Sequence, residues 1–193
     1  MSVFRSLRVG NCVVGNAVVS GCSGVCAESG PGIAIAVGLS ILNVFRQAWW
    51  PYSTTLGSIP GVPGYHDTST NADAELVDDV VIFRFDAPLI FVNARSFRSH
   101  VESFVNVARP PRWIIVAAEP MTDVDTTAAS MLGELVDSLR DRGVVMVFAE
   151  MKDPVQEKIR RYGLYDTIGA GNFFPTNKSA VEAIRAVGNA EEL

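Results

Sequence analysis

The stretch WIIVAAEPMTDVDTTAASMLGELVDSLRDRGVVMVFA, residues 113–149, decides the fold. Its two ends, Trp113–Ala118 and Val144–Ala149, are continuous apolar runs, which are typical of strands covered on both faces. Between them, residues 126–142 place leucine and valine at spacings of three and four, opposite charged side chains, as in an amphipathic helix. Asp125 suits the N-cap of that helix. The stretch therefore predicts a strand, a helix and a second strand parallel to the first.

The flanking sequence extends this alternation in both directions. Val80–Phe85 and Leu89–Val92 are short β-rich runs separated by Asp86–Pro88, which predicts a hairpin. Apolar spacing and proline or glycine punctuation predict three further helices, at residues 94–108, 154–163 and 178–187. Two opening strands followed by alternating helices and strands indicate an α/β domain over residues 79–190, with helices packed on a small mixed sheet.

The amino-terminal part differs in composition from this domain. The 193 residues carry a net charge of −5, which argues against a nucleic-acid partner. The apolar segment Gly32–Phe45 is followed by Arg46 and then by two tryptophans, as where a helix leaves a bilayer. A full span needs ~20 apolar residues, so this segment is short. Residues 30–50 are therefore interpreted as the remnant of a terminal transmembrane helix, with a buried core helix as the alternative.

Two other segments are predicted to lack regular structure. Residues 1–29 are assigned to a poorly structured leader, although Val19–Cys22 resembles the lipobox of bacterial lipoproteins. The three cysteines of this leader have no histidine nearby, so neither a disulfide framework nor a zinc site is predicted. Prolines and glycines are closely spaced from Pro51 to Asp73, which predicts a linker over residues 51–78.

Three ordered motifs carry a family resemblance. VVIFRFDAPLIFVNARSFRSHV, residues 80–101, and VDTTAASMLGELVDSLRDRGVVMVFAEMKDPVQEKIRRYGL, residues 124–164, resemble the STAS domain at the cytosolic end of SulP anion transporters. GIAIAVGLSILNVFRQAWWPYSTTLGSIPGVPGYHD, residues 32–67, resembles the end of the last membrane helix and its connector. Several motifs in the expected order are more specific than any single signature.

The resemblance implies the STAS fold and a role without catalysis. The chain is expected to be a truncated piece of a sulfate or related anion transporter, acting in regulation and assembly and not transporting alone. The implied partners are the transmembrane domain of a transporter or a second STAS domain in a homodimer. The implied location is the cell membrane with the domain on the cytoplasmic side, or the cytoplasm if the apolar segment does not insert.

The STAS fold is shared with bacterial anti-sigma-factor antagonists, which gives an alternative function. In antagonists an Asp-Ser-Ser begins a helix, and one serine is phosphorylated by a partner kinase. The matching residues are Asp125, Thr126 and Thr127, with Thr127 at the acceptor position. The alternative is therefore a stand-alone signalling module, switched at Thr127 by a kinase or switch protein. Ala128-Ala129 replaces the Gly-Leu of antagonists, which favours the transporter branch.

The same residues have a purely structural interpretation as well. Asp125 and Thr126 can simply cap the helix. Because helix N-termini attract anions, Thr126 and Thr127 are also the candidates for contact with an anion or nucleotide. Gly169-Ala170-Gly171 lacks the Lys-Ser/Thr of a phosphate-binding loop, so no cofactor is expected and nucleotide binding is a minor alternative.

No catalytic or metal site is predicted. The sequence contains neither G-x-S-x-G nor H-E-x-x-H. His100 lies off the apolar stripe of its predicted helix and is expected to be solvated. Lys158, Arg160 and Arg161 form a basic patch, interpreted as a solvated helix face or as a docking surface for acidic loops or anionic headgroups.

Overall fold

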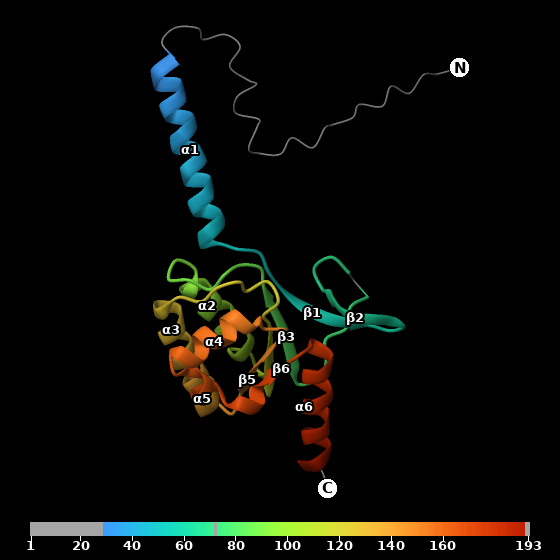
Figure 1. Ribbon diagram of the computed structural model, residues 1–193. Helices are drawn as coiled ribbons and strands as arrows, with labels where there is room; N and C mark the ends of the chain where they lie inside the picture. The colour runs from blue at the N-terminus through green and yellow to red at the C-terminus, as the bar shows by residue number, and fades with distance from the viewer. Residues whose placement is uncertain (1–28, 72, 192–193) are drawn as a thin grey trace, which may run out of the picture. The chain divides into compact units, whose positions relative to one another are not determined.

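The computed structural model describes residues 29–71 and 73–191 (Figure 1). The chain divides into two compact units, Met1–Gln47 and Ala48–Leu193. The predicted leader, its three cysteines and the lipobox-like motif lie outside the described residues, apart from Ser29. The second unit contains every strand that the structure describes, and it begins well before the predicted start of the domain at residue 79.

Helix α1, Ser29–Trp49, contains the whole predicted apolar segment. Its isoleucine, leucine and valine side chains are exposed on all sides, and Arg46 is its only charged residue. Within residues 29–71 and 73–191, no helix combines the length and the apolar character that crossing a bilayer requires.

The second unit is built on a six-stranded mixed sheet in the order β2-β1-β3-β4-β5-β6. Strand β1 is antiparallel to both β2 and β3, whereas β3, β4, β5 and β6 are mutually parallel. The strand bounds are β1 Ser53–Ile59, β2 Val62–Asp67, β3 Val80–Phe85, β4 Trp113–Ala117, β5 Val145–Ala149 and β6 Phe173–Phe174. The predicted α/β class with a small mixed sheet is confirmed.

The prediction that residues 51–78 lack regular structure is wrong. Strands β1 and β2 form a hairpin in this segment, and Gly61 at its tip has a φ of +81°, which glycine adopts without steric cost. Gly57 allows the backbone of Glu75 to approach β1, where the Ser58 amide donates to the Glu75 carbonyl at 2.8 Å. The glycines and prolines here form a tight hairpin and let the backbone of Glu75 approach β1 closely. They do not mark a linker.

The prediction of a strand at Leu89–Val92 is also wrong. Leu89 forms a single parallel bridge with Val124, and the chain then turns. The buried Asn93 side chain fixes this turn, because it accepts from the Ile90 amide at 3.0 Å and donates to the Pro88 carbonyl at 2.9 Å. The antiparallel partner of β3 is therefore the upstream strand β1.

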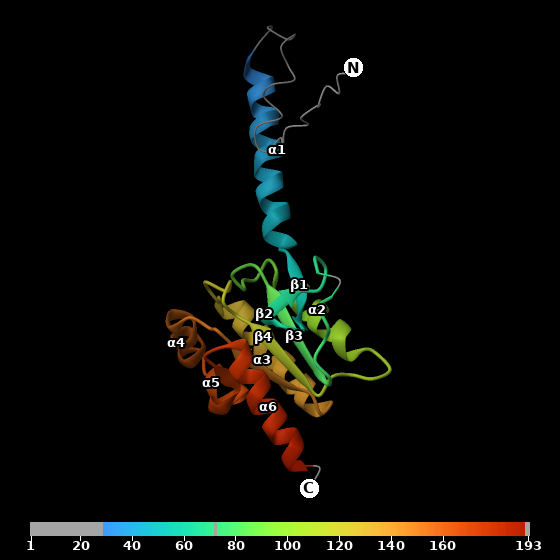
Figure 2. The same cartoon turned by 90° about the vertical axis from the view of Figure 1, so that its right-hand side faces the viewer.

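Helices cover both faces of the sheet, with α2 to α5 on one face and α6 on the other (Figures 1 and 2). Their bounds are α2 Ala94–Val105, α3 Thr126–Asp141, α4 Asp153–Arg161, α5 Leu164–Ile168 and α6 Asn177–Glu191, with a 3-10 turn at Ala170–Asn172. The larger core contains Phe83, Phe85 and Phe97, and the smaller core contains Leu56 and Ile82. Because Leu56 lies in β1, the hairpin belongs to the packed domain.

Candidate functional site

The N-terminus of α3 is held by Asp125, at the predicted N-cap. One carboxylate oxygen, Oδ1, accepts from the Ala128 amide at 2.7 Å. The other, Oδ2, accepts from the Phe91 amide at 2.7 Å. Asp125 therefore caps α3 and also ties this helix to the loop between β3 and α2, a contact that the sequence does not predict.

Thr126 and Thr127, the predicted anion contact and phospho-acceptor, occupy the first turn of α3 with exposed side chains. The Thr126 carbonyl accepts from the Ser130 hydroxyl at 3.2 Å. Among residues 29–71 and 73–191, neither threonine hydroxyl has a hydrogen-bond partner. Both hydroxyls are accessible to a protein partner, and the regulatory role of Thr127 stays a prediction.

The three predicted basic-patch residues each have a partner inside the domain. The Lys158 ammonium donates to Asp123 Oδ1 and forms an ion pair with it, which lowers the pKa of Asp123 and raises that of Lys158. The Arg160 guanidinium lies 4.5 Å from the centroid of the Tyr165 ring, and Arg161 pairs with Glu157 at 3.5 Å. These contacts argue against the docking interpretation of the patch.

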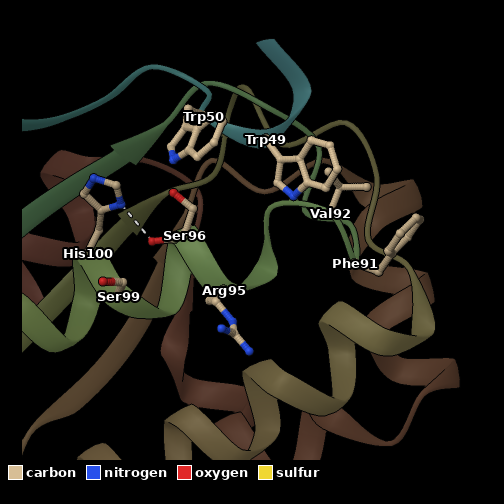
Figure 3. A pocket seen from close by; sticks show the side chains of 8 residues that line it. All are labelled: Trp49, Trp50, Phe91, Val92, Arg95, Ser96, Ser99 and His100. Atoms are coloured by element: carbon tan, nitrogen blue, oxygen red, sulfur yellow. Dashed lines mark hydrogen bonds between the residues drawn. The ribbon is translucent and has the colours of Figure 1, made fainter. Parts of the chain in front are cut away.

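An open cavity of about 520 Å³ lies at the start of α2 (Figure 3). We call it the aromatic hollow; it is lined by Trp49, Trp50, Phe91, Val92, Arg95, Ser96, Ser99 and His100. Trp50 and Phe91 are 70% and 67% exposed, which is unusual for large aromatic side chains. The paired tryptophans are visible in the sequence, but their proximity to Phe91 depends on the fold.

His100 is not the solvated histidine that the sequence predicts. It is half-buried, its ring stacks on Phe83, and Nδ1 lies 2.7 Å from the Ser96 carbonyl oxygen. Since a carbonyl only accepts, Nδ1 carries the proton in this contact. Nε2 lies 3.2 Å from the Ser53 hydroxyl, so His100 joins α2 to the first residue of β1.

A second polar centre, around Asp67, is not predicted from the sequence. Its Oδ1 accepts from the Thr54 and Ser69 hydroxyls, each at 2.6 Å, and from the Ser69 amide at 2.8 Å. Its Oδ2 accepts from the Tyr52 hydroxyl at 2.6 Å. The bonds from Ser69, Thr54 and Tyr52 hold the pKa of Asp67 well below its usual range. Asp67 is the last residue of the stretch 32–67 that carries the family resemblance, which is the sequence signal for this site.

The comparisons with known proteins agree on one family. The profile of the STAS domain family matches residues 71–180. A probable sulfate transporter of Mycobacterium tuberculosis is 37% identical over 157 residues, covering 80% of this chain and 28% of the transporter. Sulfate transporter 1.3 of Arabidopsis thaliana is 31% identical over 161 residues, covering 79% of this chain and 24% of that protein.

A solved structure shows the same fold. The murine anion transporter Solute Carrier 26 family member A9, in its inward-facing state, superposes with a TM-score of 0.71 at 23% identity. The match covers 81% of this chain and 26% of that transporter, so this chain spans about a quarter of the length of the transporters it matches. On the family profile and these matches, the chain belongs to the STAS domain family and is homologous to SulP-type sulfate transporters.

Proposed function

We propose that this chain is the cytosolic regulatory and assembly domain of a sulfate or related anion transporter, and that it packs against a transmembrane domain. The observation that carries the proposal is the aromatic hollow, with Trp50 and Phe91 exposed at its edge. Exposed aromatic side chains around a concavity are typical of protein-binding surfaces. The role is structural and regulatory, and transport is proposed for the whole assembly.

In this proposal α1 is the tether to the membrane. Its exposed apolar side chains need a partner other than water, and Arg46 is its only charged residue. The helix would meet lipid or other membrane helices, with Trp49 and Trp50 at the interface, where tryptophan is enriched. The domain would then lie on the cytoplasmic side of the cell membrane, where it could also meet a second copy.

Replacing Trp50 by alanine is expected to weaken docking about tenfold or more, because an exposed tryptophan at a hot spot contributes ~2 kcal/mol or more. The measurement is the affinity of this chain for the detergent-solubilised membrane portion of the M. tuberculosis relative, produced without the region that aligns with this chain.

The matched control is Leu76→Ala. Leu76 is 58% exposed but lies outside the aromatic hollow, so its loss is expected to change the affinity less than twofold. The proposal fails if the unmodified chain does not bind, or if the two substitutions weaken binding equally.

A second candidate function is a switch by phosphorylation at Thr127, and it is favoured by one observation. Thr127 is exposed in the first turn of α3, where the helix dipole stabilises a phosphate. The charges of Asp123 and Asp125 would oppose a phosphate, and that of Asp123 is partly offset by its ion pair with Lys158.

The Thr127→Ala chain is expected to lose all of its phosphate in cells that contain the cognate kinase, whereas Thr126→Ala keeps it. Intact-mass spectrometry of the purified chains measures this directly. Phosphate retained by the Thr127→Ala chain, or absent from the unmodified chain, contradicts the switch at this residue.

A further inference from the structure

The Asp125 carboxylate joins two elements that are far apart in the sequence. Its two oxygens accept from the Ala128 amide in α3 and from the Phe91 amide, each at 2.7 Å, and Phe91 is 34 residues upstream of Asp125. Phe91 is one of the three exposed aromatic residues of the aromatic hollow, with Trp49 and Trp50. One side chain thus contacts both the start of α3 and the backbone of the proposed docking surface.

The residues on either side of Phe91 are anchored independently. The Leu89 amide donates to the Asp123 carbonyl at 2.9 Å, and the Leu89 carbonyl accepts from the Asp125 amide at 3.2 Å. Directly before Phe91, the Ile90 amide donates to the Asn93 side chain at 3.0 Å, and after Phe91 helix α2 begins at Ala94. Between these anchors, the Asp125 carboxylate is what holds the Phe91 amide.

We propose that Asp125 is a positioning residue that couples the N-terminus of α3 to the aromatic hollow. A negative charge added at Thr127 lies next to this carboxylate, repels it and competes with it for the Ala128 amide. The carboxylate then releases the Phe91 amide, and the Phe91 ring changes its position at the edge of the hollow. The functional meaning of this coupling rests on the proposed docking role of the hollow.

The direct test is amide hydrogen exchange of the full chain in detergent micelles, monitored residue by residue by NMR. In Asp125→Ser the hydroxyl still caps α3 but is too short to reach both amides. The Phe91 amide is expected to exchange about tenfold to a hundredfold faster, because it loses a hydrogen bond to a charged group. The Ala128 amide is expected to stay protected. The matched control is Asp137→Ser, which removes an exposed carboxylate of α3 that pairs with Arg140.

The coupling itself is tested with Thr127→Glu and Thr127→Gln, which have the same size and differ in charge. The glutamate is expected to speed exchange at Phe91, and the glutamine to leave it unchanged. Unaltered Phe91 exchange in Asp125→Ser, or equal exchange in the two Thr127 variants, overturns the proposal. Because exchange is measured without a partner, a failure to bind a membrane portion overturns the docking function and leaves this result standing.

Discussion

A chain that begins at Ala48 is expected to fold, whereas a chain that begins at Asp79 is expected to be unfolded or insoluble. Strand β1 pairs with β3 from Ser53 opposite Phe85 to Leu56 opposite Ile82. Its removal leaves the apolar strand β3 with an open edge, and such edges pair with other chains. It also removes Leu56 from the smaller core, which leaves Ile82 partly uncovered.

A third chain, beginning at Gly64, separates the contributions of the two hairpin strands. It keeps four residues of β2, Gly64–Asp67, but among the described strands β2 pairs only with β1, so this chain is expected to behave like the one from Asp79. Soluble yield, circular dichroism and the urea midpoint of each chain measure the difference. Equal cooperative unfolding of the chains from Ala48 and Asp79 would show that the hairpin is dispensable.

Replacing Phe83 by alanine is expected to lower the free energy of unfolding by about 3–5 kcal/mol. Phe83 is 1% exposed, and its ring lies 5.6 Å from that of Phe97, 5.4 Å from that of Phe104 and 6.1 Å from that of His100. The substitution leaves a cavity among side chains of β3 and α2, whose backbones are fixed by the sheet and the helix.

Urea unfolding, monitored by tryptophan fluorescence, measures this loss in the free energy of unfolding. The control is Phe91→Ala, which removes the same ring from an exposed site and is expected to change the free energy of unfolding by less than about 0.5 kcal/mol. If Phe83→Ala lowers the free energy of unfolding by less than about 1 kcal/mol, the surrounding core side chains have moved into the cavity. That outcome would contradict the tight aromatic packing described for this face of the sheet.

The elements around α3 could be predicted from sequence nearly to the residue. The helix begins at Thr126 as predicted and ends at Asp141, one residue early, and β4 and β5 differ from prediction by one residue each. Long amphipathic helices have strong periodic patterns and doubly covered strands are continuous apolar runs, because burial decides most of their positions. The capping role of Asp125 was predictable for the same reason, since it depends on local sequence alone.

The hairpin and the aromatic hollow could not be predicted in this way. Strand β1 is rich in serine and threonine, and its partner β2 contains both Pro63 and Gly64, so local patterns favour a linker. The hollow depends on Trp50 and Phe91, which the fold brings together through β1 and the loop before α2. The second contact of Asp125 is likewise set by tertiary structure, because its partner is 34 residues away.

The two outer strands of the sheet limit how copies of this domain can associate. At one edge β6 has only two residues, and at the other edge β2 carries Pro63, which has no amide hydrogen to donate, and Gly64 with a φ of +100°. Neither edge offers a regular row of donors and acceptors to an incoming strand. Copies of the domain at high concentration are therefore protected against continuous sheet growth, and any pairing between them has to use side-chain surfaces.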